Sequence, residues 1–293
     1  MKKVLSTILL VALACLMLVG CNSGTPSTSK ADAQKVILVI SFGTSYNESR
    51  DATIGAVEKA IADAYPDYDV RRAFTSQIII DILAERENLE IDNVDQAMER
   101  LVADGVKELI VQPTHLMNGF EYDDLVKEVM EYNDKFDSLI IGKQLLDSDA
   151  DFAAVIDVIT AETASYSNDS TAIIFMGHGT EHDSNHVYED LQEKLTAAGF
   201  PNYFIGTVEA EPTLEDVIAK AKNGGFSKVV LEPLMVVAGD HANNDMAGDE
   251  EDSWKTVFEE EGFEVECVLR GLGEFNGIQK IYIQHIQDSI NKL

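Results

Sequence analysis

Two patterns of apolar residues alternate along the chain. Short runs of consecutive apolar residues are typical of strands buried in a parallel sheet, and longer segments with an apolar residue every three or four positions are typical of amphipathic helices. Strands are predicted at 36–42, 69–74, 107–112, 138–142, 171–176, 202–208, 227–232 and 264–268. Helices are predicted at 49–64, 76–87, 93–104, 121–134, 150–166, 184–198, 213–223, 250–261 and 276–291. The alternation predicts an α/β fold with parallel strands, four in each half of the chain.

The two halves also match in sequence at the points where their strands end. Ser41-Phe-Gly-Thr44, after the first predicted strand, lines up with Gly177-His-Gly-Thr180 after the fifth, at an offset of 136 residues. Pro113 to Glu121, after the third strand, lines up with Pro233 to His241 after the seventh, at an offset of 120 residues. Two matches at equivalent points predict an internal duplication, and hence two similar lobes, each with a four-stranded parallel sheet flanked by helices.

Length and charge narrow the classes of function. The chain has 293 residues, enough for two cores of about 130 residues each, and we expect an N-terminal lobe over residues 36–145 and a C-terminal lobe over residues 146–293. Its 22 Lys+Arg against 52 Asp+Glu give a net charge of −30. This charge argues against nucleic acid or an anionic membrane surface as a partner, because phosphate binding needs clustered positive charge. An anionic substrate would need a locally basic pocket.

The N-terminal segment is typical of a targeting sequence followed by a linker. Lys2 and Lys3 precede an apolar run from Val4 to Gly20 that is shorter than a typical membrane span, and a polar stretch follows it. We therefore expect a signal peptide over residues 1–20, an exported protein, and a flexible linker over residues 21–35.

The end of the apolar run, Leu18-Val-Gly-Cys21, resembles a bacterial lipoprotein box. Such a box predicts lipidation of Cys21 and a lipid anchor as the only contact with a membrane, on the outer face of the cytoplasmic membrane or in the periplasm. A plain signal peptide with a chance cysteine is the alternative. Removal of residues 1–20 would also remove Cys15 and leave Cys267 as the one unmodified thiol, which excludes an intramolecular disulfide.

A ten-residue segment, GHGTEHDSNH, holds three of the six histidines of the chain. On a helix, His178, His182 and His186 would share one face and could bind zinc, but the predicted strand at 171–176 makes GHG a loop at the carboxyl end of that strand. His178 therefore lies where parallel α/β sheets bind ligands, while His182 lies in the loop and His186 in the first turn of the next helix. The flanking glycines favour a function for His178, because they let backbone and substrate approach closely.

Equivalent positions after the sixth and seventh strands offer Glu209 and His241. Two imidazoles and a carboxylate suit Co²⁺, Ni²⁺, Fe²⁺ or Zn²⁺ and leave coordination positions open for chemistry. The spacings between these residues carry no local signature, and the alternative is that both are ordinary polar residues of loops.

Five segments begin at the ends of predicted strands: SFGTSYNESRDATIGAVEKAI, VQPTHLMNGFEYDDL, MGHGTEHDSNHVYEDL, GTVEAEPTLEDVI and PLMVVAGDHANNDMAGDEEDSWK. Together they resemble the anaerobic sirohydrochlorin cobaltochelatase family of class II chelatases. The resemblance implies a chelatase-like fold of two Rossmann-like or flavodoxin-like lobes with the active-site cleft between them. It also implies insertion of a divalent metal, Co²⁺ before Fe²⁺ or Ni²⁺, into sirohydrochlorin or a related tetrapyrrole, as in anaerobic cobalamin biosynthesis, without a nucleotide.

The resemblance assigns site residues position by position. The metal histidines fall on His178 and His241, the ligand glutamate on Glu209 and a second active-site glutamate on Glu121. Of these, His178, Glu121 and His241 are the expected catalytic residues. His115 resembles a histidine of the same family loop, and haem binding by this residue is a further hypothesis, suggested by relatives located outside the cytoplasm.

The duplication adds an asymmetry between the two halves. It pairs His178 with Phe42, Glu209 roughly with Thr75, and His241 with Glu121. We therefore expect the C-terminal lobe to deliver the metal, while Phe42 packs on the macrocycle and Glu121 handles protons or tunes the metal. Thr44, which is equivalent to Thr180, and His115 are further candidates for substrate binding.

Sirohydrochlorin carries eight carboxylates, which an acidic protein must accommodate. Arg50, Arg71 and Arg72, near the first two strands, are the predicted local counter-charges. The alternative is an exposed helix start for Arg50 and an ordinary strand for the other two.

Two other classes of function remain open, because export is unexpected for an enzyme whose substrate is made in the cytoplasm. One is an extracytoplasmic lipoprotein that binds haem or another metallotetrapyrrole or removes its metal. The other is a protein that captures free metal for a transporter. A homo-oligomer is a further hypothesis.

Overall fold

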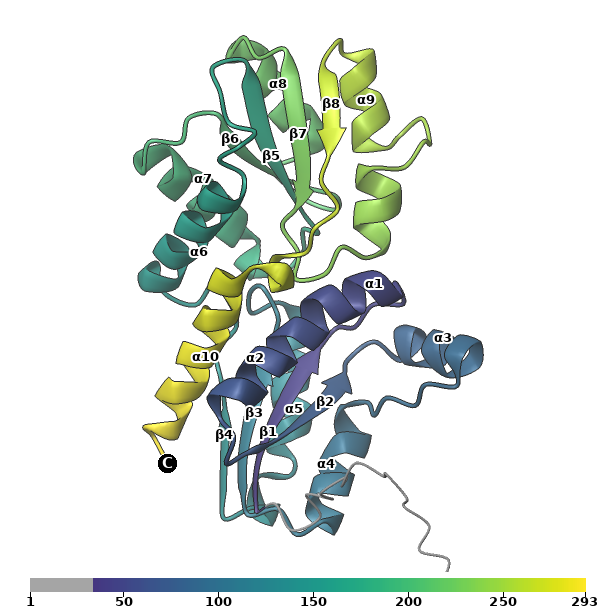
Figure 1. Ribbon diagram of the computed structural model, residues 1–293, viewed down its shortest axis with the longest axis vertical. Helices are drawn as coiled ribbons and strands as arrows, with labels where there is room; N and C mark the ends of the chain where they lie inside the picture. Colours follow the sequence, from purple (N-terminus) through teal and green to yellow (C-terminus); the bar gives the residue numbers. More distant parts are fainter. Residues whose placement is uncertain (1–33) are drawn as a thin grey trace, which may run out of the picture. The chain divides into compact units, whose positions relative to one another are not determined.

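Two four-stranded parallel sheets organise residues 34–293, the part of the chain that this computed structural model describes (Figure 1). The first sheet has the order β2-β1-β3-β4, and the second has the order β6-β5-β7-β8, so each strand has an equivalent in the other lobe. The strands are β1 (Lys35–Ser41), β2 (Asp69–Phe74), β3 (Glu108–Pro113), β4 (Ser138–Ile141), β5 (Thr171–Gly177), β6 (Tyr203–Thr207), β7 (Lys228–Pro233) and β8 (Glu264–Cys267). The predicted two-lobed α/β fold is confirmed. The expected signal peptide, most of the linker, and Cys21 lie outside the described residues.

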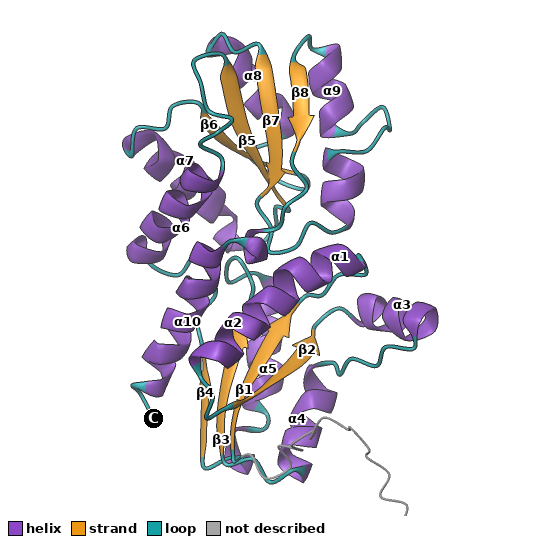
Figure 2. Ribbon diagram, in the orientation of Figure 1, coloured by secondary structure: helices purple, strands orange, loops and turns teal. Residues whose placement is uncertain are grey.

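Helices flank both sheets (Figure 2). They are α1 (Asn47–Arg50), α2 (Ala56–Ala64), α3 (Gln77–Glu87), α4 (Val94–Ala103), α5 (Phe120–Met130), α6 (Asp149–Glu162), α7 (His186–Ala197), α8 (Leu214–Asn223), α9 (Trp254–Glu260) and α10 (Asn276–Ile290). A π-helical turn over Asp51–Gly55 joins α1 to α2, and a second π-helical turn spans Ala242–Met246. No helix in residues 34–293 is long and apolar enough to cross a membrane.

The strands are buried because their side chains pack on both faces of each sheet. In β1, Ile37 and Val39 belong to a cluster that also holds Ile173 and Phe175 of β5. The alternate residues, such as Leu38, pack on the opposite face in a second cluster. This burial on both sides explains why the strands are nearly continuous apolar runs in the sequence.

Helix α6 follows the first sheet but lies against the second lobe. Lys194 Nζ of α7 donates to Asp149 Oδ1 of α6 at 2.7 Å, and the hydroxyls of Thr163 and Tyr203 lie 2.9 Å apart. The segment after β4 therefore crosses to the second lobe.

Helix α10 follows the second sheet but lies against the first lobe, beside α2 (Figure 1). The Tyr65 hydroxyl donates to the carbonyl of Ile283, and the Tyr282 hydroxyl donates to the carbonyl of Thr114, both at 2.8 Å. This helix lies within the range expected for the C-terminal lobe, and it ties that range to the first sheet.

Candidate metal centre and substrate cavity

The loop after β5 holds His178 close to the sheet. Gly179 has a φ of +86°, and a Cβ at this position would lie 2.8 Å from the backbone nitrogen of Ala210, so the position requires glycine. The Gly179 N–H donates to the buried Tyr188 hydroxyl at 3.2 Å. His178 Nδ1–H donates to the Gly179 carbonyl at 2.8 Å, which leaves the Nε2 lone pair free to bind a metal.

His178, Glu209 and His241 converge at the ends of β5, β6 and β7. Each offers one ligand atom, and these atoms all lie within 4.8 Å of one another. The rings of His178 and His241 meet edge to face with centroids 4.6 Å apart, and the Glu209 N–H donates to the His178 carbonyl at 2.8 Å. The arrangement suits a borderline divalent cation and leaves coordination positions open. The structure therefore brings the predicted metal ligands together.

Asp245 fixes the orientation of His241, and the sequence reasoning missed it. His241 Nδ1–H donates to Asp245 Oδ2 at 2.7 Å, across the π-helical turn that starts after His241. A carboxylate partner sets the tautomer and raises the basicity of a ligating imidazole. The signal in the sequence was the spacing of four residues, which carries meaning only once this segment is known to be helical.

A cavity of about 630 Å³ faces this triad and is lined from both lobes. Its walls are largely apolar, with Ile54, Ile79, Leu116, Leu234 and Val237 among the lining residues. Such a lining suits a flat hydrophobic ring system.

Four of the other predicted residues also line this cavity. Phe42 is 47% exposed. Thr44 is buried, and its hydroxyl accepts the Tyr46 N–H at 3.2 Å. A Cβ on Gly239 of the second lobe would lie 3.3 Å from Thr44 Oγ1, so the two lobes approach closely here.

The third of these residues is Glu121, in the first turn of α5 on the opposite wall. Thr75 Oγ1 donates to Glu121 Oε2 at 3.0 Å. Thr75 and Glu121 are the repeat equivalents of Glu209 and His241, so equivalent positions meet in both halves. Glu121 is not part of the ligand triad.

His115 lines the same cavity with an unusual environment. Both of its ring nitrogens are shielded from solvent and have no hydrogen-bond partner, and its ring lies edge to face with Tyr122. Burial lowers the pKa of His115 to about 4, so the ring is neutral at pH 7.

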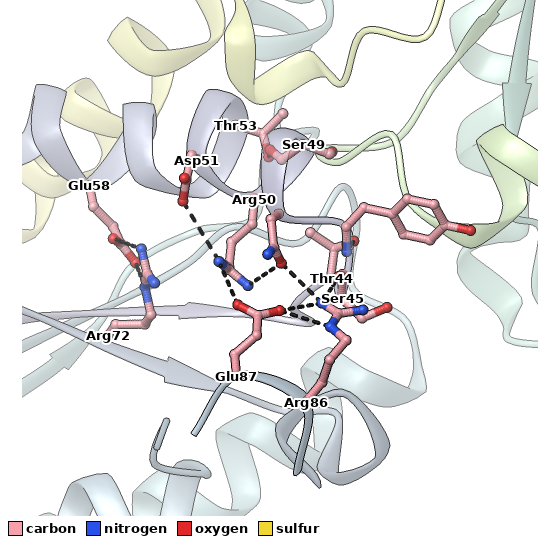
Figure 3. A network of polar contacts seen from close by, with 12 residues as sticks. Thr44, Ser45, Ser49, Arg50, Asp51, Thr53, Glu58, Arg72, Arg86 and Glu87 are labelled. Carbon is pink, nitrogen blue, oxygen red and sulfur yellow. Dashed lines mark hydrogen bonds and ion pairs between the residues drawn. The ribbon is translucent and has the colours of Figure 1, made fainter. Parts of the chain in front are cut away.

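The three arginines expected to face the substrate do not line the cavity. Arg50 is buried against Asn47 and Glu87 (Figure 3). Arg72 donates two hydrogen bonds to Glu58, at 2.7 and 2.5 Å. Arg71 pairs with Asp69 and Asp104. Acids of their own lobe satisfy all three, and this departs from the expectation that they are counter-charges for the substrate.

The other histidines of the GHGTEHDSNH segment lie apart from the triad. His182 Nδ1 accepts the Ser184 N–H at 3.0 Å, and its Nε2 lies 3.3 Å from Asp123 of α5. His186 begins α7, and its Nδ1–H donates to the Asp183 carbonyl at 2.7 Å. The three histidines do not share one helix, as expected.

Two matching α/β lobes and an open metal-ligand triad facing an apolar cavity define a metal chelatase of the two-lobed class. A solved structure of this fold is the sirohydrochlorin chelatase SirB from Bacillus subtilis subspecies spizizenii in complex with cobalt, with a TM-score of 0.60, 11% identity, and coverage of 88% of this chain and 96% of that chain. The chain belongs to the cobalt chelatase (CbiK) family, whose model matches residues 35–291.

Two relatives match over most of their length. The sirohydrochlorin cobaltochelatase of Salmonella typhimurium is 38% identical over 258 residues, which cover 88% of this chain and 97% of the relative. The sirohydrochlorin cobaltochelatase CbiKC of Nitratidesulfovibrio vulgaris is 32% identical over 262 residues, which cover 89% of this chain and 92% of the relative.

Proposed function

We propose that this chain inserts Co²⁺ into sirohydrochlorin, with Fe²⁺ and Ni²⁺ as competing metals. The observation that carries the proposal is the open triad of His178, Glu209 and His241 on one wall of an apolar cavity between the lobes. The two relatives described above are named sirohydrochlorin cobaltochelatases, and this supports sirohydrochlorin as the ring and Co²⁺ as the metal.

Metal insertion requires different functions from the two walls of the cavity. Insertion exchanges two pyrrole N–H protons for one divalent cation, so the site must hold a partly desolvated metal, accept protons and bring the ring nitrogens to the metal. The triad holds the metal substrate, and its incomplete ligation lets the metal leave for the macrocycle. Glu121, which faces the cavity without belonging to the triad, is the proton acceptor, and Phe42 packs on the ring.

An anaerobic assay of the purified protein tests this function. Sirohydrochlorin and Co²⁺, Fe²⁺ or Ni²⁺ are mixed with the protein, and formation of the metallated ring is followed by absorption spectroscopy. We expect Co²⁺ insertion well above the rate without protein. Tight binding of Co²⁺ without insertion would instead indicate a protein that captures metal, and a tetrapyrrole pigment that remains bound after purification would indicate a binding protein.

We further propose that the protein is an exported lipoprotein anchored through Cys21. The support is the sequence alone, namely two lysines, an apolar run and the Leu18-Val-Gly-Cys21 box. A lipid on Cys21 would hold the catalytic lobes at a membrane surface through a polar linker.

A further inference from the structure

The side chains that line the cavity include acids but no lysine or arginine. The acids are Glu121, Glu181, Glu209 and Asp240. Sirohydrochlorin brings eight more carboxylates. A negative ring beside a negative wall needs a cation close by, because burying like charges together raises the free energy of the complex.

Arg86 is the cation that borders the cavity. Its Nη2 donates to the carbonyl of Ser45, a residue that lines the cavity (Figure 3). In the described part of the chain, no other lysine or arginine side chain makes a hydrogen bond or ion pair with a lining residue. Arg86 lies in the last turn of α3, whose Ile79 also lines the cavity.

Two of the partners of Arg86, Glu87 and Asn47, would keep a contact with Arg50 without it. Its Nε–H donates to Glu87 Oε1 at 2.9 Å, and Arg50 Nη2 lies 3.5 Å from the other oxygen of Glu87. Its Nη2 donates to Asn47 Oδ1 at 3.0 Å, and Arg50 Nη1 donates to the same oxygen at 3.1 Å.

The two arginines differ in their freedom to move. The Arg50 side chain is only 8% exposed, whereas the Arg86 side chain is 48% exposed. Arg50 therefore holds this network in place, and Arg86 is free to turn toward a ligand.

We propose that Arg86 binds a peripheral carboxylate of the tetrapyrrole at the cavity and thereby sets a preference for acidic macrocycles. The inference rests on the proposed function. A guanidinium matches a carboxylate with two parallel N–H groups, so one side chain can both neutralise and orient the ring edge. It replaces Arg50, Arg71 and Arg72 as the counter-charge for the substrate.

The test compares Arg86→Gln and Arg86→Lys with the wild-type protein on two macrocycles. One is sirohydrochlorin, and the other is a porphyrin with two carboxylates. For sirohydrochlorin we expect the KM of Arg86→Gln to rise about 10-fold with kcat nearly unchanged, since removing a charge-assisted hydrogen bond has about this effect. The dicarboxylate KM should change much less, and Arg86→Lys should recover part of the loss. Arg100→Gln, which removes an exposed arginine paired with Asp92, is the control for net charge.

Two outcomes of these assays would contradict the proposed role of Arg86. An equal rise in KM for both macrocycles, or no rise for either, would show that Arg86 serves only to clamp the Ser45 loop. Equilibrium binding of metal-free sirohydrochlorin, followed by fluorescence, gives the same comparison without turnover. A protein that inserts no metal but loses sirohydrochlorin affinity in Arg86→Gln would overturn the proposed function and support the role of Arg86.

Discussion

Glu232 of β7 is a carboxyl group in the core without a partner. It is fully buried, neither oxygen has a hydrogen-bond partner, and burial raises its pKa to about 8. The equivalent residue of the first half is Gln112, also fully buried, whose amide donates to the carbonyls of Pro113 and Lys143 at 2.8 Å. The same position is therefore filled by an amide in one lobe and by an acid in the other.

We expect Glu232→Gln to stabilise the protein at alkaline pH. A raised folded-state pKa means that the folded protein binds a proton that the unfolded chain releases, so stability is lost as the pH rises from about 4.5 to about 8. The variant has no such loss, and its advantage in the free energy of unfolding should grow to roughly 3–5 kcal/mol at pH 8.5. Urea unfolding at pH 5 and pH 8.5 measures it.

The reverse substitution at the equivalent position of the first lobe is the control. Gln112→Glu should lower stability more at pH 8.5 than at pH 5, because it places an acid in the same buried environment. A stability difference for Glu232→Gln that is the same at both pH values would show that its carboxyl does not titrate in this range.

Asp245 should matter for metal affinity although it is not one of the three converging ligands. Asp245→Ala removes the acceptor of His241 Nδ1–H, and we expect Co²⁺ binding to weaken by about 10- to 100-fold. Asp245→Asn keeps an acceptor and should lose less. Titration with Co²⁺ measures affinity, and the visible absorption of the bound Co²⁺ reports its ligand geometry. An unchanged affinity and spectrum in Asp245→Ala would contradict the positioning role.

At the level of elements, the strands were the easiest part to predict from sequence. They are buried on both faces and so appear as apolar runs, and the parallel order then brings the ends of β5, β6 and β7 to one edge. The pattern of strand ends in the sequence was therefore enough to group His178, Glu209 and His241.

Polar segments were harder to predict. Residues 242–246 form a π-helical turn that lies outside the helices predicted from the sequence. The helix predicted from residue 250 begins at Trp254, where Ser253 caps it by accepting the Thr256 N–H. The roles of Arg50 and Arg86 depend on how α3 packs against the Ser45 loop, and the sequence does not encode that contact locally.

Glu121 on α5 and His241 after β7 lie on opposite walls of the cavity, and only His241 belongs to the ligand triad. Their substitution should therefore affect metal affinity and insertion rate differently. His241→Ala should weaken binary Co²⁺ binding, because it removes a ligand of the triad. Glu121→Gln should leave that affinity nearly unchanged and slow insertion by about 10²- to 10⁴-fold, as expected for loss of a proton acceptor. Paired metal titrations and turnover assays separate the two. A loss of binary affinity in Glu121→Gln as large as in His241→Ala would mean that both walls share the metal.

For the whole molecule, the location of the protein is a prediction that the described residues do not test. Cys21→Ser should abolish lipid labelling and release the protein from membranes, while insertion activity in solution stays unchanged, because the described lobes begin after the linker. Metabolic labelling with a fatty acid and fractionation measure this. Detection of an unmodified Cys21 in the mature protein by mass spectrometry would reject the anchor.

The crossing of α6 and α10 has a consequence for the origin of the fold. Each is the helix that follows the last strand of its own sheet, and each packs against the other lobe, with His285 Nε2–H donating to Asp151 Oδ1 at 2.9 Å where they meet. A half-length chain ending after α6 would present this helix without the surface it covers. Two copies could cover each other's exposed surface by exchanging this helix, so the arrangement within the present chain is what fusion of a domain-swapped homodimer would produce.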